Sequence, residues 1–159
     1  PLFVLDIHRV TMYSIHRNSM YILPTEVFLM LKKKQSIEHT QLLVLSLLSG
    51  EDMEELLPHC RKRLILHGNG KAYLSSSAAQ VIAESGLILI GTDAVSIAAP
   101  FDEMRTHLEL ARANVAVLEN LYLNGVEDGV YTLCAFPIKL TELEAAPCRA
   151  VLVDDGKGI

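Results

Sequence analysis

Short apolar runs alternate with amphipathic stretches through the middle of the chain. Arg63–His67, Leu87–Ile90 and Val115–Leu123 are rich in Leu, Ile and Val and have the length expected for strands. The segments between them carry helix signals. This alternation predicts an α/β fold with a mixed β-sheet and flanking helices.

Capping signals predict the first two helices. Ser49-Gly-Glu-Asp52 resembles a capping box and opens a short helix that ends before the next proline. Ser75 or Ser76 caps a second helix that runs through Glu84, and Gly86 is the residue expected to close it.

A third helix is expected after Pro100, with Asp102 as its cap. His107 falls beside the apolar stripe predicted for this helix, because residues three or four apart share a helix face. That stripe consists of Met104, Leu108, Ala111 and Val115.

The outer parts of the chain add further elements. Residues 7–16 are rich in β-branched and aromatic side chains and predict a strand. Pro24 is followed by a possible short helix at Thr25–Leu31, and Thr40–Leu48 predicts a strand buried on both faces. Two more strands are expected at Val130–Ile138 and Arg149–Val153. We expect residues 1–159 to form a single domain.

Composition narrows the class of protein. With 159 residues, 50% of them hydrophobic, the chain is long enough to bury a core. A net charge of -5 argues against nucleic acid as a partner. The apolar runs are too short to cross a membrane, and no signal peptide is visible.

The three cysteines are Cys60, Cys134 and Cys148. Their spacing is not that of a disulfide or metal motif, which favours reduced thiols in a cytoplasmic protein.

Glu119 is the residue with most to explain. It lies in an apolar stretch that includes Val117, Leu118 and Leu121, where a buried carboxylate needs a cation or several donors. His16, His107 and Glu119 could together bind zinc or manganese. Ligands spread over so long a stretch form no motif, and spacing alone favours a structural histidine and a hydrogen-bonded glutamate over a metal site.

Neither of two known functional motifs, the phosphate-binding loop and the serine-hydrolase elbow, is present in the sequence. His67-Gly-Asn-Gly-Lys71 lacks the glycine spacing of a phosphate-binding loop, and Ala72 replaces the hydroxyl that would hold magnesium, so we interpret it as a Gly-rich turn. No Gly-x-Ser-x-Gly elbow is present, which argues against a serine hydrolase of that architecture.

From about Ser49 to Val153 the chain resembles the metal-dependent cyclase-like hydrolases, the family of bacterial kynurenine formamidases and isatin hydrolases. The resemblance lies in several stretches taken together. These are Arg63-Leu-Ile-Leu-His with Leu74-Ser-Ser-Ser-Ala-Ala, Gly86-Leu-Ile-Leu-Ile-Gly-Thr-Asp93 with Ser96, His107, Val117-Leu-Glu119-Asn-Leu, Gly129-Val-Tyr-Thr-Leu-Cys-Ala-Phe-Pro137 and Ala146-Pro147-Cys-Arg149-Ala-Val-Leu.

The resemblance implies a cyclase-like (swivelling β/α/β) fold with His107 and Glu119 as metal ligands. It also implies a homo-oligomer with sites near the subunit contacts. The family's His-x-Gly-Thr-His-x-Asp-x-Pro-x-His signature falls at residues 16–26, where His16 and Pro24 match. The chain begins without Met and resembles a member that lacks part of the family's N-terminal segment.

Three signature positions are replaced, and each replacement has a chemical consequence. Ile22 stands where the family has the Asp that bridges two metals, so a two-metal site is not expected. Met20 is a poor substitute for imidazole on zinc. Glu26 replaces the acid/base His and could itself transfer protons or supply a ligand oxygen.

Two hypotheses follow. In the first, His16, His107 and Glu119 hold one zinc or manganese ion and Glu26 acts as base, in a hydrolase for a formamide or small cyclic amide. In the second, the chain is a catalytically degenerate paralogue with a structural or ligand-binding role, which three replaced positions favour for strict catalysis. Both predict a small-molecule partner and a homo-oligomer, without nucleic acid or membrane.

Overall fold

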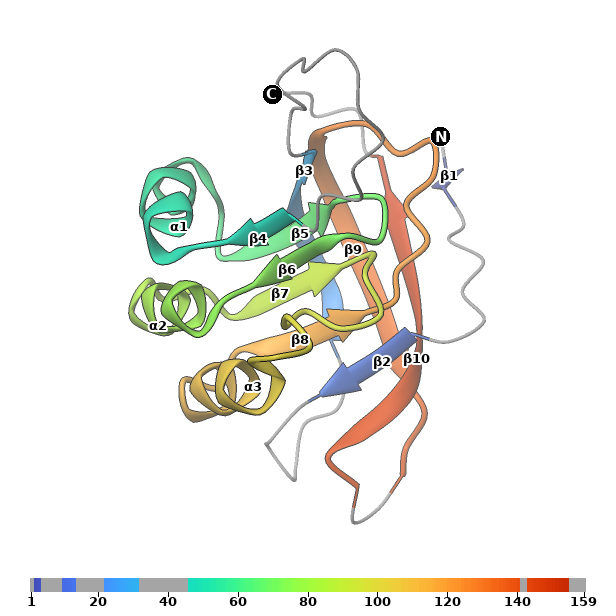
Figure 1. Cartoon of the computed structure of the whole chain (residues 1–159). Coiled ribbons are helices and arrows are strands. Elements are labelled where there is room, and N and C mark those ends of the chain that lie inside the picture. The colour runs from blue at the N-terminus through green and yellow to red at the C-terminus, as the bar shows by residue number, and fades with distance from the viewer. Residues whose placement is uncertain (1, 4–9, 14–21, 32–45, 141–142, 155–159) are drawn as a thin grey trace.

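The computed structural model describes residues 2–3, 10–13, 22–31, 46–140 and 143–154, with side chains from residue 47 onward. Eight strands form one mixed sheet in the order β1-β10-β2-β8-β7-β5-β3-β9, and β4 and β6 form a small parallel pair (Figure 1). The strands are β1 Leu2–Phe3, β2 Val10–Tyr13, β3 Ile22–Leu31, β4 Ser46–Leu48, β5 Arg63–His67, β6 Ala72–Leu74, β7 Leu89–Thr92, β8 Ala116–Glu119, β9 Gly129–Pro137 and β10 Ala145–Val153.

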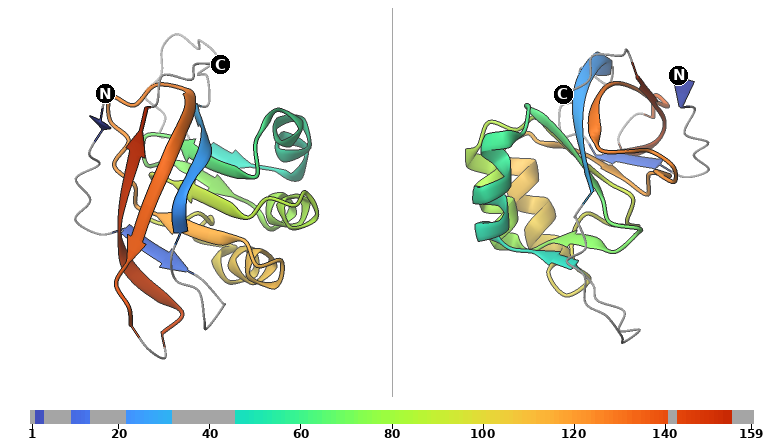
Figure 2. Two further views of the ribbon diagram at one scale, coloured as in Figure 1. Left: turned by 180° about the vertical axis from the view of Figure 1, so that it is seen from behind. Right: turned by 90° about the horizontal axis from the view of Figure 1, so that it is seen from above.

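The large sheet closes on itself through β10. Along one edge β10 pairs with β9 from Cys148 to Val153, and along the other it pairs with β2 and β1. Since β9 also pairs with β3, the hydrogen bonds run in a complete ring (Figure 2). Closure of this kind leaves few unpaired strand edges.

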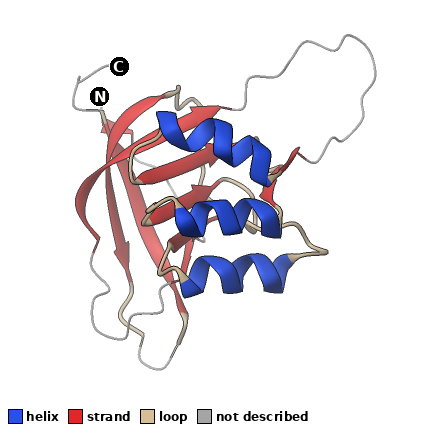
Figure 3. Ribbon diagram, turned by 90° about the vertical axis from the view of Figure 1, so that its left-hand side faces the viewer, coloured by secondary structure: helices blue, strands red, loops and turns tan. Residues whose placement is uncertain are grey.

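Three helices cover one side of the sheet (Figure 3). They are α1 Gly50–Leu56, α2 Ser76–Glu84 and α3 Glu103–Arg112, and a short 3-10 turn, η1 Leu57–His59, follows α1. The predicted caps of the first two are confirmed. Ser49 and Asp52 form a reciprocal capping box, and the Ser75 hydroxyl accepts the N–H of Ala78.

Alternation along the strands divides the core into two layers. Leu64 and Leu66 of β5 pack with the helices, whereas Ile65 packs inside the ring with residues of β8, β9 and β10. Successive strand side chains point to opposite faces, so one apolar run serves both layers. Each fully buried aliphatic side chain contributes roughly 1.5–3 kcal/mol.

The prediction of a helix at Thr25–Leu31 is wrong, because these residues belong to β3. This strand lies between β5, to which it is parallel, and β9, to which it is antiparallel. The pairing on both sides outweighs the local helix signal. Pro24 lies where the register with β9 shifts, a position at which a strand tolerates a residue without an N–H.

The predicted apolar stripe of α3 is wrong at two of its four positions. Val115 is buried, as predicted, and Ala111 is partly buried. Met104 is 78% exposed and Leu108 is 47% exposed, whereas Thr106 and Leu110 are fully buried. The helix packs against α2 through the Thr106–Leu110 face. Hydrophobicity predicts the wrong face of the helix here, because the polar residue Thr106 is buried while the apolar residues Met104 and Leu108 are exposed.

Asp102 occupies the N-cap position of α3, as predicted, but its side chain does not cap that helix. Its Oδ2 instead accepts the N–H of Ser76, 2.8 Å away in the first turn of α2. The orphan N–H groups of a helix start attract any nearby carboxylate. Asp102 therefore links the starts of two neighbouring helices.

Several predicted strand bounds shift. The strand predicted at Leu87–Ile90 is observed at Leu89–Thr92, and the strand predicted at Val115–Leu123 covers only Ala116–Glu119. Within Thr40–Leu48, residues 40–45 lie outside the described part, and Leu47 is 41% exposed instead of buried. Residues 7–16 contain β2, and the expected strand at Arg149–Val153 begins earlier, at Ala145.

The parallel strands β5, β7 and β8 end at one edge of the sheet, at His67, Thr92 and Glu119. In α/β proteins, with open sheets and with closed barrels alike, ligands bind at the carboxyl ends of parallel strands. We therefore expect a functional site at this edge of the sheet. No helix in the described residues is long and apolar enough to cross a bilayer.

Candidate metal centre

Glu119 is the last residue of β8 and is only 3% exposed. The strand stops there because Asn120 has a positive φ of 60°, a conformation that asparagine tolerates better than most residues. The N–H of Asn120 donates to the Ala94 carbonyl at 2.8 Å, and that of Leu121 donates to the Thr92 carbonyl. These bonds fix the Glu119 backbone beside the loop that follows β7.

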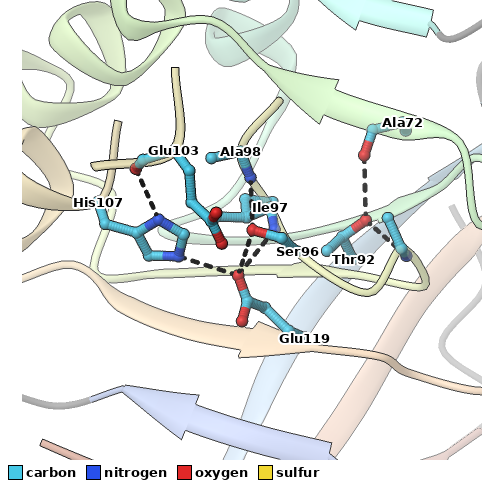
Figure 4. Close-up of polar contacts among 9 residues, drawn as sticks. Ala72, Thr92, Ser96, Ile97, Ala98, Glu103, His107 and Glu119 are labelled. Atoms are coloured by element: carbon cyan, nitrogen blue, oxygen red, sulfur yellow. Dashed lines mark hydrogen bonds and ion pairs between the residues drawn. The ribbon is translucent and has the colours of Figure 1, made fainter. Parts of the chain in front are cut away.

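That loop supplies two donors to the buried carboxylate. The N–H of Ile97 donates to Glu119 Oε1 at 2.7 Å, and the Ser96 hydroxyl donates to the same oxygen at 3.3 Å (Figure 4). The demand for donors, predicted from the apolar flanks of Glu119, is thus confirmed. Buried carboxylates are stable when hydrogen bonds of this kind replace water.

His107 of α3 supplies the third contact. Its Nε2 lies 3.0 Å from Glu119 Oε1, and its Nδ1 lies 2.9 Å from the backbone carbonyl oxygen of Glu103 (Figure 4). Both ring nitrogens therefore face oxygen acceptors. Nδ1 must carry a proton to bond a carbonyl, so Nε2 needs either a second proton or a metal ion in its place.

The pKa of His107 is raised. The largest cause is the hydrogen bond to Glu119, followed by the opposing effect of burial and then by the Glu103 carbonyl and the charges of both glutamates. The side chain of His107 is 23% exposed, whereas that of Glu119 is 4% exposed. The hydrogen bond to the buried carboxylate therefore favours the protonated form of His107.

The chemistry of this pair fits part of a metal site. Hydrogen bonding of Nδ1 to a backbone carbonyl is the usual way in which a metal-binding histidine is oriented, and it leaves Nε2 as the ligand atom. The hydrogen bonds to Glu119 from described residues all end on Oε1. Imidazole and carboxylate together suit zinc or manganese. No group of three or more His, Cys, Asp or Glu placed to hold a metal occurs among the described residues.

The other predicted site residues are described less fully. His16 and Met20 lie outside the described residues, and only the backbone of Ile22 and Glu26 in β3 is described. Glu26 pairs with Thr132 of β9.

The register of the sheet places the Glu26 backbone relative to the pair. Met30 pairs with Leu66, which pairs with Thr92. Glu119 lies one residue beyond the Gly91–Leu118 pair of the next strands, and so falls in the same row. Glu26 precedes Met30 by four residues, so its backbone lies about 13 Å along β3 from the row that contains Glu119.

The segment His67-Gly-Asn-Gly-Lys71 forms a turn, as predicted. Asn69 and Gly70 have positive φ angles of 52° and 73°, and Gly68 donates its N–H to Asp93 Oδ1 at 3.0 Å. His67 Nε2 lies 3.7 Å from Asp93 Oδ2, too far for a direct hydrogen bond. The turn thus ties the end of β5 to the loop that serves Glu119.

Sequence patterns did not indicate the roles of Ile97 and Glu103. Each contributes a backbone group, and backbone groups leave no signal in residue type. Ser96 was visible as part of the family-like stretch that ends β7, although nothing in that stretch indicated its contact with Glu119.

Comparison with known proteins identifies relatives. The chain is 33% identical over 105 residues to the kynurenine formamidase of Bacillus cereus, covering 65% of this chain and 43% of that protein. It is 33% identical over 116 residues to the kynurenine formamidase of Delftia acidovorans, covering 67% of this chain and 56% of that protein. The chain spans about half the length of such relatives. No protein-family model matches it.

Solved structures share the fold. A predicted metal-dependent hydrolase from Bacillus stearothermophilus matches with a TM-score of 0.70 at 20% identity, over 91% of this chain and 76% of that one. An isatin hydrolase bound to a product analogue matches with a TM-score of 0.62 at 14% identity, over 90% of this chain and 70% of that one.

The predicted fold class is thereby confirmed: the chain has the α/β fold of the cyclase-like hydrolases. In sequence it is similar to bacterial kynurenine formamidases over about two thirds of its own length.

Proposed function

We propose that the protein is a metal-dependent hydrolase that cleaves the C–N bond of a formamide or small cyclic amide. The observation that carries this proposal is the His107–Glu119 pair, with Nε2 and Oε1 3.0 Å apart and Nδ1 hydrogen-bonded to the Glu103 carbonyl. The sequence likeness to kynurenine formamidases supports the assignment.

His107 and Glu119 are the residues that would hold the ion, which we propose to be zinc or manganese. The chemistry supplied by such an ion is Lewis-acid activation of water and of the amide carbonyl. The chain's own contribution is orientation. The Glu103 carbonyl fixes the His107 ring, Ser96 and Ile97 fix the Glu119 carboxylate, and burial of Glu119 keeps competing water away.

His16 as a third ligand and Glu26 as the base remain part of the proposal. Glu26→Gln removes proton transfer but keeps the size of the side chain. It is expected to lower kcat by roughly 100-fold or more while leaving metal affinity unchanged. If Glu26 is a ligand instead, the same substitution lowers metal affinity. The homo-oligomer predicted from the resemblance is tested by sedimentation velocity of the full chain.

The function is tested with manganese- or zinc-loaded protein and two substrates, N-formylkynurenine and isatin. We expect release of formate from the first or ring opening of the second, and loss of turnover in both His107→Ala and Glu119→Gln. Metal bound at the pair without turnover of either compound would favour the degenerate paralogue with a ligand-binding role. The likeness to enzymes favours the hydrolase.

A further inference from the structure

The loop between β7 and α3 holds Glu119 by one oxygen. Ile97 and Ser96 both donate to Oε1, and none of the hydrogen bonds between described residues ends on Oε2. Two donors on a fixed backbone segment hold Oε1, which leaves Oε2 as the oxygen that accepts no hydrogen bond from a described residue. The loop therefore presents one defined oxygen of a buried acid.

The Ser96 hydroxyl is itself oriented. It accepts the N–H of Ala98 at 3.2 Å, which directs its own proton to Glu119. The result is a short chain of donors, from the Ala98 amide through the hydroxyl to the carboxylate. Such chains strengthen each bond and lock the rotamers involved.

The loop is anchored on both sides. The Ile97 carbonyl accepts the N–H of Leu74 at 2.7 Å, and the Leu74 carbonyl accepts the N–H of Ala99 at 3.2 Å, which stitches the loop to β6. Ala94, Ile97 and Ala98 are fully buried. Ser96 therefore extends from a fixed backbone, as a residue that orients a ligand must.

Metal binding changes which donors remain. His107 Nε2 donates to Oε1 only while it carries a proton, and it gives up that proton when it becomes a ligand. Ser96 and Ile97 then remain as the described donors to Oε1. Both are neutral, so the carboxylate keeps its full charge for the ion.

We propose that Ser96 is a positioning residue that, together with the Ile97 amide, makes Oε2 of Glu119 the metal-binding oxygen. This inference rests on the proposed function. It assigns Oε2 of Glu119 as the ligand atom. It also predicts that Ser96 raises metal affinity, apart from any effect of Ser96 on folding.

Ser96→Ala is the direct test, and Ser85→Ala is its matched control. Ser85 has a hydroxyl that likewise accepts an N–H two residues on, from Leu87, and donates to an oxygen, the Ile82 carbonyl. Affinity for Mn²⁺ and Zn²⁺ is measured by competition with a chromogenic chelator, beside thermal unfolding of metal-free protein. We expect Ser96→Ala to weaken metal binding by about 10-fold or more, because partners that orient a ligand typically contribute that much.

Ser85→Ala is expected to change affinity less than about 2-fold, and Ser96→Thr, which keeps the hydroxyl, is expected to restore most of it. Equal affinity in wild type and Ser96→Ala would overturn the inference and leave the proposed function standing. A wild-type chain that binds neither ion would overturn both. If Ser96→Ala does not fold, a crystal structure of the manganese-loaded wild type decides: coordination through Oε2 supports the inference, and coordination through Oε1 contradicts it.

Discussion

His107 and Glu119 come from α3 and β8 and meet with Nε2 3.0 Å from Oε1 at the edge where three parallel strands end. The Glu103 carbonyl holds the opposite side of the imidazole ring. Because Nδ1 donates to that carbonyl, Nε2 carries either a proton, which it donates to Oε1, or a metal ion in place of that proton. The site can therefore be probed in both forms.

In metal-free protein the pair should be coupled. A double-mutant cycle with His107→Ala and Glu119→Gln at pH 6 is expected to give a coupling free energy of about 1–2 kcal/mol in urea unfolding, because the bond is charge-assisted and its acceptor is buried. The control is the exposed Arg112–Glu109 pair, for which less than about 0.5 kcal/mol is expected. Equal coupling in the two cycles would show that burial of Glu119 does not matter.

The coupling should depend on pH. Since the folded-state pKa of His107 is raised above the ordinary value of 6.5, mainly by the hydrogen bond to Glu119, the contribution to stability is fully present below 6.5. It is lost as pH rises through the raised folded value. The stability difference between wild type and His107→Gln should therefore shrink from pH 5.5 to pH 9, measured by urea unfolding in the presence of a chelator. A difference that grows over this range would contradict the assignment.

Asp102 should stabilise α2 instead of the helix it precedes. Hydrogen bonds from the side chain and backbone N–H of Ser76 lower the pKa of Asp102. Its stabilising effect is thus present above its ordinary pKa and lost as pH falls through the lowered value. Asp102→Ala is expected to lower Tm at pH 7, and the difference should vanish in strong acid. Hydrogen exchange should locate the loosened amide at Ser76, and loosening confined to the start of α3 would show that Asp102 caps its own helix.

Two leucines on α3 test the corrected helix face. Leu110 is fully buried and Leu108 is 47% exposed. We expect Leu110→Ala to lower the free energy of unfolding by about 2–5 kcal/mol and Leu108→Ala by less than about 0.5 kcal/mol. The chemistry of the two substitutions is identical, so chemical denaturation compares burial alone. A larger loss of unfolding free energy in Leu108→Ala than in Leu110→Ala would show that the helix packs through the stripe predicted from the sequence.

The sequence predicted the fold best where local signals and tertiary packing agree. Arg63–His67 is a strand in both accounts because its apolar run lies between charged residues and a Gly-rich turn and is buried on both faces. Ser75 caps α2 because a serine hydroxyl before a helix has few better partners. These signals act over a few residues, which a sequence displays directly.

Long-range pairing was less visible. Thr25–Leu31 follows a proline and admits a helix, yet β5 and β9 recruit it as a strand. The closure of the sheet through β10 depends on contacts between segments far apart in the chain and has no local signature. Topology of this kind emerges only when the whole core is assembled.

The candidate site was predicted in part. Burial singled out Glu119, and the family resemblance singled out His107 with it; the structure brings the two together. The sequence does not indicate the Ile97 amide or the Glu103 carbonyl, because any residue type could provide these backbone groups. His16 lies outside the described residues, and its role stays a prediction.

Metal titration of the full chain tests the central claim most directly. Calorimetry with Mn²⁺ or Zn²⁺ at pH 7.5 should show about one ion bound per chain, with affinity reduced by roughly 100-fold or more in both His107→Ala and Glu119→Gln. The Glu109→Gln control, which removes a partly buried carboxylate from the same helix, should bind like wild type. Wild-type affinity retained in both His107→Ala and Glu119→Gln would contradict the assignment of this pair as the metal ligands.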